Sequence, residues 1–428
     1  MTARAVAAPG SAASTTVGRL LRALAVCLLP VLVGLYSGAT TFGGGSFRPW
    51  HPVMVDLDVY RRAGRLLLQG GDVYNLPGQL PFLYPPFAAL LAVPLALLPA
   101  TLVQMAWTAA SSLAMLAVLF RFGLTGWGLS LVTSAVVFLV VPVSQTLAFG
   151  QLGIFLVALV LLDLAPGPRL LGARRLLPEG TLTGLATAIK LTPAIFLLYL
   201  LLVRRRRAAA TLAATFVAVS LVSAAVLPSE SLTFWTRLAH GSTGLGSSIV
   251  YYVNQSVLAD SIRILGLGSL ATLVGLALSA VVALVGVWAA AVWHGLAEVR
   301  LAVSLCGVAG LLASPVSWLH HFVWIVPLGL CLLEGRGLSP IPRPPGGAPT
   351  PARTALPSWA RVIGWLFIGW VMAAPFQRLP NGGNVELTYR WSQNVLASTT
   401  AVLGTALLVA AVVSGRRLTR SRLSAGRR

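Results

Sequence analysis

Residues 55–87, VDLDVYRRAGRLLLQGGDVYNLPGQLPFLYPPF, lie shortly after the first long apolar run of the chain and lead straight into the next one. Their arginines surround three of the ten acidic residues in the whole chain, Asp56, Asp58 and Asp72. On a helix, residues three and four positions apart share a face, so the sequence predicts that Asp58 lies near Arg61 and Arg62. A carboxylate where the chain leaves an apolar run, among cations able to hold an anion, indicates chemistry at a membrane surface.

The composition excludes a soluble globular protein. Of 428 residues, 57% are hydrophobic and 10% are charged, and the mean hydropathy is +0.85, whereas soluble domains carry about 25% charged residues. So much apolar surface predicts an integral membrane protein. The net charge of +21 does not indicate nucleic-acid binding, because the arginines lie between apolar runs and in the C-terminal sequence SGRRLTRSRLSAGRR. Contact with anionic lipid and the positive-inside rule account for them there.

Cysteines and nucleotide motifs exclude several further classes. The cysteines lie in apolar runs without CxxC or CxxH spacing, which favours buried thiols at Cys27, Cys306 and Cys331. The run 20–37 is long for a signal peptide and many runs follow it, so we interpret it as an uncleaved first span. The sequence has neither GxGxxG nor GxxxxGK[ST], which argues against an ATP-driven pump and a soluble nucleotide-sugar enzyme.

A membrane helix needs about 20 mostly apolar residues, and about twelve stretches meet this description. They lie near 19–38, 82–100, 102–120, 128–146, 151–166, 181–203, 208–227, 268–294, 300–317, 319–335, 360–376 and 393–414. Arginines before the first run, at 204–207 and in the C-terminal tail orient the chain with both termini in the cytoplasm. The predicted divisions are a transmembrane core at 1–335 with outer loops at about 39–81 and 228–262, a Pro- and Gly-rich cytoplasmic linker at 336–358, C-terminal spans within 359–414 and a basic tail at 415–428.

Ionisable side chains at membrane depth are costly and mark functional sites. Lys190, in GLATAIKLTPAIF, is the single lysine of the chain. It is either a snorkelling side chain or an ammonium that holds a lipid-linked phosphate. His320 and His321 begin a span in SPVSWLHHFVWIVP, and because adjacent helical residues face different ways, we expect only one of them to touch substrate. No Cys or acidic residue stands nearby at ligand spacing, which argues against zinc.

Amides and an arginine gather in the second outer loop. In YYVNQSVLADSIRILG, the residues Asn254, Gln255 and Arg263 suit a polar rim that binds a sugar or a phosphate. Gln151, in LAFGQLGIF, is a weaker candidate of the same kind, with a buried packing role as the alternative. The triplet at 56–58 could be a metal-binding DxD, but the sequence offers no further oxygen ligands, so no metal is expected.

Six elements of the chain occur in a specific order: VDLxVY, FxYPPF, FGQ, GxxxAxKLTP, NQS with a later Arg, and SPxSWxHH. Over residues 50–335 they resemble the actinobacterial polyprenol-phosphate-mannose-dependent α-1,2-mannosyltransferases, glycosyltransferase family 87 of the GT-C superfamily. The resemblance implies an all-α polytopic fold of the GT-C type with long outer loops 1 and 4. It also implies a plasma-membrane location, with the active site on the extracytoplasmic face.

The resemblance implies a reaction as well. The donor would be polyprenyl-phosphate mannose and the acceptor a phosphatidylinositol mannoside, lipomannan or lipoarabinomannan, with no cofactor. Alignment of the VDLxVY element gives Asp56 as the general base, with Asp58 ranked second. A β-mannosyl phosphate becomes an α-mannoside, so the configuration inverts in one displacement. The remaining expected site residues are His320 and His321 as catalytic candidates, and Lys190, Arg263, Asn254, Gln255, Tyr84 and Gln151 around the donor phosphate and sugar.

Two segments depart from the family pattern: the Gly-rich loop TTFGGGSFRPWHPVM at 40–54, and residues 164–182. If acceptor choice resides there, we expect side-branch addition on lipomannan in preference to the pentamannoside-forming reaction. Two alternatives remain. A transporter or flippase of a lipid-linked sugar would use the lysine and histidines as coupling residues, and a GT-C enzyme for arabinose or glucose would share every motif.

Overall fold

The computed structural model describes residues 10–40, 54–76, 78, 80–170, 175–241, 244–334 and 355–425. Within these ranges the chain is helical, and its only extended pairing is an isolated antiparallel bridge between Asn254 and Trp318. The all-α expectation is confirmed. Most of the Gly-rich loop before Asp56 and of the linker at 336–358 lies outside the described residues.

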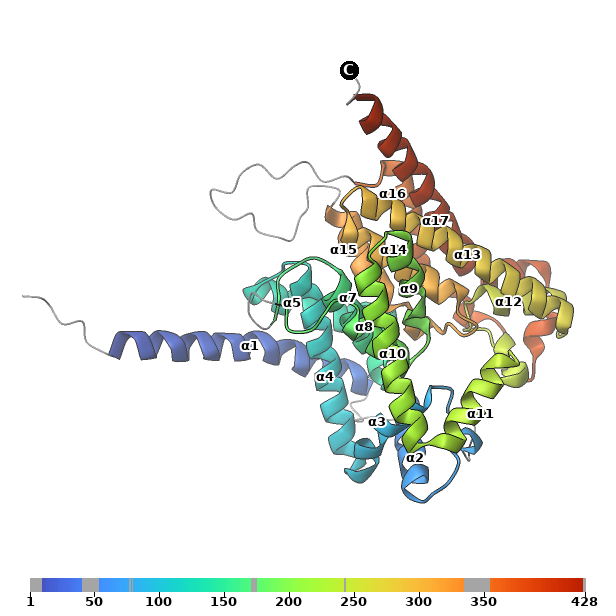
Figure 1. Ribbon diagram of the computed structural model, residues 1–428, viewed down its shortest axis with the longest axis horizontal. Coiled ribbons are helices and arrows are strands. Elements are labelled where there is room, and N and C mark those ends of the chain that lie inside the picture. The colour runs from blue at the N-terminus through green and yellow to red at the C-terminus, as the bar shows by residue number, and fades with distance from the viewer. Residues whose placement is uncertain are drawn as a thin grey trace, which may run out of the picture.

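Six described helices are long and apolar enough to cross a membrane. They are α1 (Gly10–Thr40), α4 (Ala100–Arg121), α10 (Arg206–Val226), α13 (Ser269–Gly295), α16 (Ser358–Ala373) counted together with the turn that follows it as far as Arg378, and α17 (Trp391–Ala425). Each one coincides with an apolar run seen in the sequence. In Figure 1, α13, α16 and α17 form one side of the molecule, while α1 projects from the opposite side.

The run at 128–146 forms a bent pair in place of one straight span. Helices α5 (Gly126–Leu139) and α6 (Val141–Phe149) meet at an angle of 76°. Pro142 occupies the first turn of α6, and Val140 before it is extended, with φ −82° and ψ 104°. A proline removes a backbone donor, and its ring would clash with the carbonyl four residues earlier, here that of Phe138. A helix therefore cannot run unbroken through this point.

The other apolar runs give helices too short to span about 30 Å of hydrocarbon at 1.5 Å per residue. They are α3 (Pro86–Leu97), α7 (Gly153–Leu164), α8 (Thr181–Ile189), α9 (Ile195–Leu202), α14 (Val299–Ala313) and α15 (Ile325–Glu334). The run at 181–203 breaks where Lys190 is extended, just before the 3₁₀ turn η2 (Thr192–Ala194). The expectation of twelve full spans is therefore not confirmed.

Three helices lie outside the apolar runs: α2 (Val55–Leu68), α11 (Pro228–Ala239) and α12 (Val257–Leu265). Short 3₁₀ turns join the rest, namely η1 (Val73–Asn75), η3 (Gly246–Val250), η4 (Leu319–Trp324), η5 (Pro375–Arg378) and η6 (Val385–Thr388). In Figure 1, α2 lies at the lower end of the molecule and the C-terminal end of α17 at the upper end.

Helix α2 is fixed against α3 by a close approach and by an arginine. A Cβ added at Gly64 would lie 2.5 Å from the backbone oxygen of Ala92, so only glycine fits there. Arg61 donates from Nε to the oxygen of Leu95 at 3.1 Å and from Nη2 to that of Leu98 at 2.8 Å. Carbonyls at a helix C-terminus lack intrahelical partners, and this arginine supplies them. The cation thus positions α2, and with it Asp56.

Candidate active site

Asp56 lies in the first turn of α2, outside the candidate spans, and is half-buried. Burial raises the pKa of its carboxyl group to about 6, although a hydrogen bond with Gln151 and the charge of Lys190 act in the opposite direction. A carboxylate without water around it is costly. Near neutral pH this group is therefore ionised but a stronger base than an exposed aspartate.

Gln151 reaches Asp56 because α6 ends in a left-handed turn. Gly150 has φ 69° and ψ 37°, and a Cβ there would lie 2.5 Å from Cβ of Leu57. Glycine is favoured on both counts. Gln151 Oε1 accepts from the backbone N–H of Leu152 at 3.2 Å and lies near two tyrosine hydroxyls. The Nε2 group is therefore left to donate to the Asp56 carboxylate.

Those hydroxyls belong to Tyr60 and Tyr84. Tyr60 Oη lies 3.0 Å from Tyr84 Oη and 3.1 Å from Gln151 Oε1, and Tyr84 Oη lies 3.3 Å from the same amide oxygen. Tyr84 is one of the site residues expected from the sequence, and these contacts connect it to Gln151. Tyr60 was missed, although its position four residues after Asp56 puts both side chains on one face of α2.

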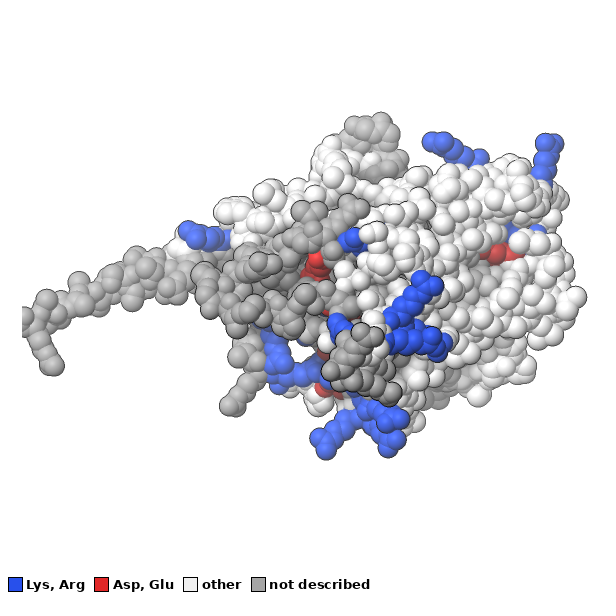
Figure 2. All heavy atoms as spheres, turned by 90° about the horizontal axis from the view of Figure 1, so that it is seen from above, with Lys and Arg blue, Asp and Glu red and all other residues white. Residues whose placement is uncertain are grey.

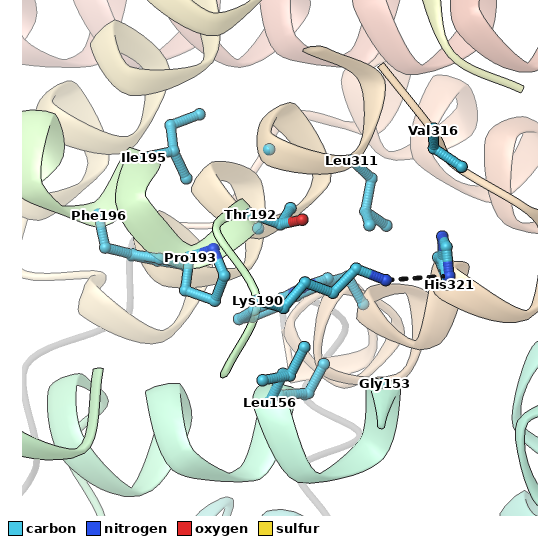
Figure 3. Close-up of a pocket in the computed structure, with 14 residues that line it drawn as sticks. Gly153, Leu156, Lys190, Thr192, Pro193, Ile195, Phe196, Leu311, Val316 and His321 are labelled. Carbon is cyan, nitrogen blue, oxygen red and sulfur yellow. Dashed lines mark hydrogen bonds between the residues drawn. The ribbon is translucent and has the colours of Figure 1, made fainter. Parts of the chain in front are cut away.

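Lys190 connects this cluster to the histidine pair. Its Nζ lies 5.3 Å from the centroid of the Tyr84 ring and 3.2 Å from His321 Nε2 (Figure 3). The extended conformation of Lys190, which ends α8, lets the side chain project across the gap. Side chains from the segment just before α3 and from η4 thus meet at one ammonium group, which the α8–η2 break supplies.

The two histidines differ in their surroundings, as adjacent residues were expected to. Their rings lie 4.6 Å apart and nearly perpendicular. His321 Nδ1 accepts from the backbone N–H of Trp318 at 3.2 Å, so a neutral ring carries its proton on Nε2, which faces Lys190. His320 packs edge-on against Phe149 at 5.0 Å, and its Nε2 has no hydrogen-bond partner among the described residues.

Lys190 and His321 also line a pocket between α7, α9 and α14 (Figure 3). The rest of its wall is almost wholly apolar, and small residues widen it at Gly153, Gly307 and Gly310. In Figure 3 the lysine side chain lies along the pocket with its ammonium group directed toward the imidazole. The arrangement places a cation at the edge of an apolar cavity, as an amphiphilic anion requires.

Asp58 is turned away from this cluster. Its Oδ2 pairs with Nε of Arg62 at 2.9 Å, and its side chain is 36% exposed. The predicted proximity of Asp58 to Arg62 is confirmed. Because Asp56 and Asp58 have different partners, the described residues present no joint pair of carboxylates, and they contain no group of three His, Cys, Asp or Glu side chains placed to hold a metal.

The amides of the second outer loop bond to the protein itself. Asn254 donates to the backbone oxygens of Ile249 at 2.9 Å and Pro315 at 3.1 Å, and its Oδ1 accepts from the N–H of Ser317 at 2.9 Å. Gln255 donates from Nε2 to the oxygen of Tyr252 and accepts from the Thr400 hydroxyl. Both side chains are fully buried, so these contacts hold the chain segment that precedes the histidines.

Arg263 belongs to the same internal network. It donates to the backbone oxygens of Val250 at 3.1 Å and Asn254 at 2.8 Å, and it forms an ion pair with Asp260 on α12. The side chain is fully buried. The structure thus places Asn254, Gln255 and Arg263 behind the Trp318–His321 turn, and these contacts do not join them to Asp56 or Lys190.

Comparison with known sequences identifies the family. The sequence model of glycosyltransferase family 87 matches residues 82–315, more than half of the chain. The chain belongs to glycosyltransferase family 87. It is a membrane glycosyltransferase, and the family resemblance stated from the ordered motifs is confirmed. No solved structure matches it.

Relatives with established names agree. A polyprenol-phosphate-mannose-dependent alpha-(1-2)-phosphatidylinositol mannoside mannosyltransferase of Mycolicibacterium smegmatis is 36% identical over 314 residues, 65% of this chain and 69% of that relative. A Mycobacterium tuberculosis protein of the same name is 29% identical over 340 residues, 73% of this chain and 77% of the relative. A phosphatidylinositol pentamannoside mannosyltransferase of M. smegmatis is 34% identical over 299 residues, 66% and 70% of the two chains.

Proposed function

We propose that this enzyme transfers mannose from polyprenyl-phosphate mannose to a lipid-anchored mannoside, forming an α-1,2 linkage with inversion. The names of the relatives support the donor, the sugar and a phosphatidylinositol mannoside acceptor. The observation that carries the mechanism is the convergence of the half-buried Asp56 carboxylate and the Lys190–His321 pair around Tyr84 and Gln151.

Asp56 acts as the general base in this proposal. Its carboxylate takes the proton of the acceptor 2-hydroxyl as that oxygen attacks the anomeric carbon and the bond from this carbon to the phosphate oxygen breaks. A base with a pKa of about 6 accepts a proton more readily than an exposed aspartate and is still ionised at neutral pH. Asp58, paired with Arg62, is not in this position.

Lys190 and His321 receive the leaving phosphate. The ammonium nitrogen and the imidazole Nε2 lie 3.2 Å apart, and an anionic oxygen beside both would accept from the ammonium and from a protonated Nε2. Fixed donors at developing charge are a major source of rate enhancement. A lipid monophosphate carries less charge than a diphosphate, so these cationic and neutral donors are sufficient. The adjoining apolar pocket suits the start of the prenyl chain.

We assign Asn254, Gln255 and Arg263 a positioning role, in place of the phosphate and sugar contacts expected from the sequence. Arg263 donates to the backbone oxygens of Val250 and Asn254. Asn254 then donates to the oxygen of Pro315 and accepts from the N–H of Ser317, in the segment that leads to Trp318. Since the N–H of Trp318 fixes the His321 ring, this network sets the orientation of the imidazole. His321 is the acting histidine of the pair.

The acceptor is a phosphatidylinositol mannoside or the mannan of lipomannan built on it, and the active site faces the extracytoplasmic side of the plasma membrane. The positive-inside rule supports this orientation, because it assigns the basic block at 204–207 and the basic end of α17 to the cytoplasm. Side-branch addition on lipomannan remains our expectation for the acceptor, and the assay below separates it from pentamannoside extension.

Purified protein in nanodiscs tests the proposal. Radiolabelled polyprenyl-phosphate mannose is supplied with a panel of phosphatidylinositol mannosides and lipomannan, and the product linkage is read by an α-1,2-specific mannosidase. We expect label in an acceptor from wild type and none from Asp56→Asn. Absence of transfer to every acceptor, with donor crossing a liposome membrane instead, would overturn the enzyme assignment in favour of a flippase.

The single lysine gives an independent test of the phosphate site. Reductive methylation with ¹³C-formaldehyde labels Lys190 and the terminal amine, so an NMR spectrum reports on one side chain. Adding polyprenyl phosphate is expected to shift the lysine signal, whereas a neutral polyprenol of the same length leaves it in place. An equal shift with both would contradict a phosphate contact at Lys190.

A further inference from the structure

A second pocket lies between the C-terminal ends of α13 and α17, away from the candidate active site. Helix α13 contributes Trp288, Ala291, Val292 and Gly295, and α17 contributes Arg416, Thr419 and Arg420. Both helices are long and apolar enough to cross a membrane, so a pocket at their ends lies at the membrane boundary. In Figure 1 the end of α17 is opposite α2.

Two guanidinium groups enter the lining of this pocket and no acidic side chain does. Arg416 and Arg420 are four residues apart and share a face of α17. Neither forms an ion pair with a described acidic residue. The Arg416 guanidinium lies 5.2 Å from the centroid of the Trp288 ring, which holds it beside the pocket.

The surface around this end of the molecule is basic. Figure 2 shows the molecule of Figure 1 from above. Lys and Arg side chains lie in groups on this mostly uncharged surface, and few acidic side chains are visible. Charge complementarity therefore favours an anionic occupant. Trp288 and the aliphatic residues of the lining favour one that also has an apolar part.

We propose that this pocket binds the phosphate-bearing headgroup of an anionic membrane phospholipid. Arg416 and Arg420 hold the phosphate oxygens, for which the planar guanidinium fork is well suited. Trp288 packs beside the glycerol region, at the depth where tryptophan is enriched in membrane proteins. The lipid joins α13 to α17 at the membrane face opposite the proposed active site.

Native mass spectrometry of the full-length protein tests this proposal. The protein in detergent is titrated with phosphatidylinositol, phosphatidylglycerol or phosphatidylcholine, and bound lipid is counted. We expect one tight site for the anionic lipids and none for phosphatidylcholine. Arg416→Gln and Arg420→Gln each weaken binding roughly fivefold, as for other arginines near an anionic surface, and the double variant shows the product of both effects.

Arg417→Gln is the matched control, because Arg417 is an exposed neighbour on the same helix and does not line the pocket. Equal weakening by Arg417→Gln would overturn the site in favour of general charge attraction. Competition by glycerol 3-phosphate or inorganic phosphate as strong as that of lipid would overturn the lipid and leave a soluble phosphate site. Unchanged thermal melting of the variants shows that a loss of binding is not a loss of fold.

Discussion

Two groups of polar residues adjoin the Trp318–His321 turn, and they use their polar atoms differently. Behind the turn, Asn254 and Arg263 donate to backbone oxygens of their own protein. In front of it, Lys190 faces another donor on His321. Buried polar groups normally find partners within the fold. The comparison separates residues that bond to the backbone of the protein from the two residues that, in the proposed mechanism, bind the leaving phosphate.

The largest loss of stability is expected from Arg263→Met, a change in the group of residues behind the Trp318–His321 turn. The change leaves Asp260 buried without its counter-ion and removes the donors to Val250 and Asn254. Breaking one partner of a buried ion pair costs about 3–5 kcal/mol. Denaturant unfolding in detergent should show this loss, and Asp260→Asn combined with Arg263→Met should recover part of it. Wild-type stability with a raised donor KM would instead return Arg263 to the phosphate role predicted from the sequence.

Lys190→Met attacks the second group and should spare the fold. Loss of a donor at developing charge lowers kcat about 10²- to 10³-fold, while thermal melting stays near that of wild type. Lys190→Arg keeps the charge and should recover part of the rate. If the Lys190→Met variant is destabilised as much as the Arg263→Met variant, Lys190 is also a structural residue and the distinction between the two groups fails.

The pH dependence should follow the half-buried carboxylate. Asp56 must be ionised to accept a proton, and its pKa is raised to about 6. The value of kcat/KM is therefore expected to fall about tenfold per pH unit below this pKa. It should fall again above about pH 8, because burial lowers the pKa of Lys190 to about 8 and the lysine then loses the charge that the leaving phosphate needs. Asp58→Asn serves as the control and should leave the fall of kcat/KM at acidic pH unchanged. A fall of kcat/KM that begins only near pH 4 would indicate that the titrating group is an exposed carboxylic acid and would contradict Asp56 as the base.

Gln151→Met should have the smallest effect on the rate of mannosyl transfer, and it tests whether a residue beside Asp56 acts on the reaction or only on packing. Its amide lowers the pKa of Asp56, so its loss moves the acidic limb to higher pH. Tyr60 and Tyr84 also lose an acceptor, at a cost of about 1–3 kcal/mol. A limb that does not move, with stability alone reduced, would make Gln151 a packing residue.

The sequence predicts which polar residues gather near the Trp318–His321 turn. It does not predict which of them bond to the protein backbone and which lie beside Lys190. The ordered motifs led to the prediction that Asp56, Lys190 and His321 belong to the site, and the structure places them around Tyr84 and Gln151. Nothing local distinguishes them from Arg263, because a buried guanidinium binds a phosphate or a carbonyl equally well. Which of these it meets depends on contacts with residues distant in the sequence.

The same limit applies to the spans. Hydropathy detects apolar runs and locates six long helices correctly. It does not register where a run breaks, as at 128–146 and 181–203, because an extended residue or a proline changes the path without changing the mean hydropathy. One of those breaks places Lys190 beside Tyr84 and His321, so these contacts depend on a departure from the regular helix.

The most direct test of the account compares Asp56→Asn with Asp58→Asn in the same nanodiscs. Both changes remove one carboxylate from one helix, two residues apart. We expect Asp56→Asn to lower the rate of mannosyl transfer at least about 10²-fold, and Asp58→Asn, which breaks only an exposed ion pair, to stay within about threefold of wild type. Equal losses, or a larger loss in Asp58→Asn, would contradict Asp56 as the base.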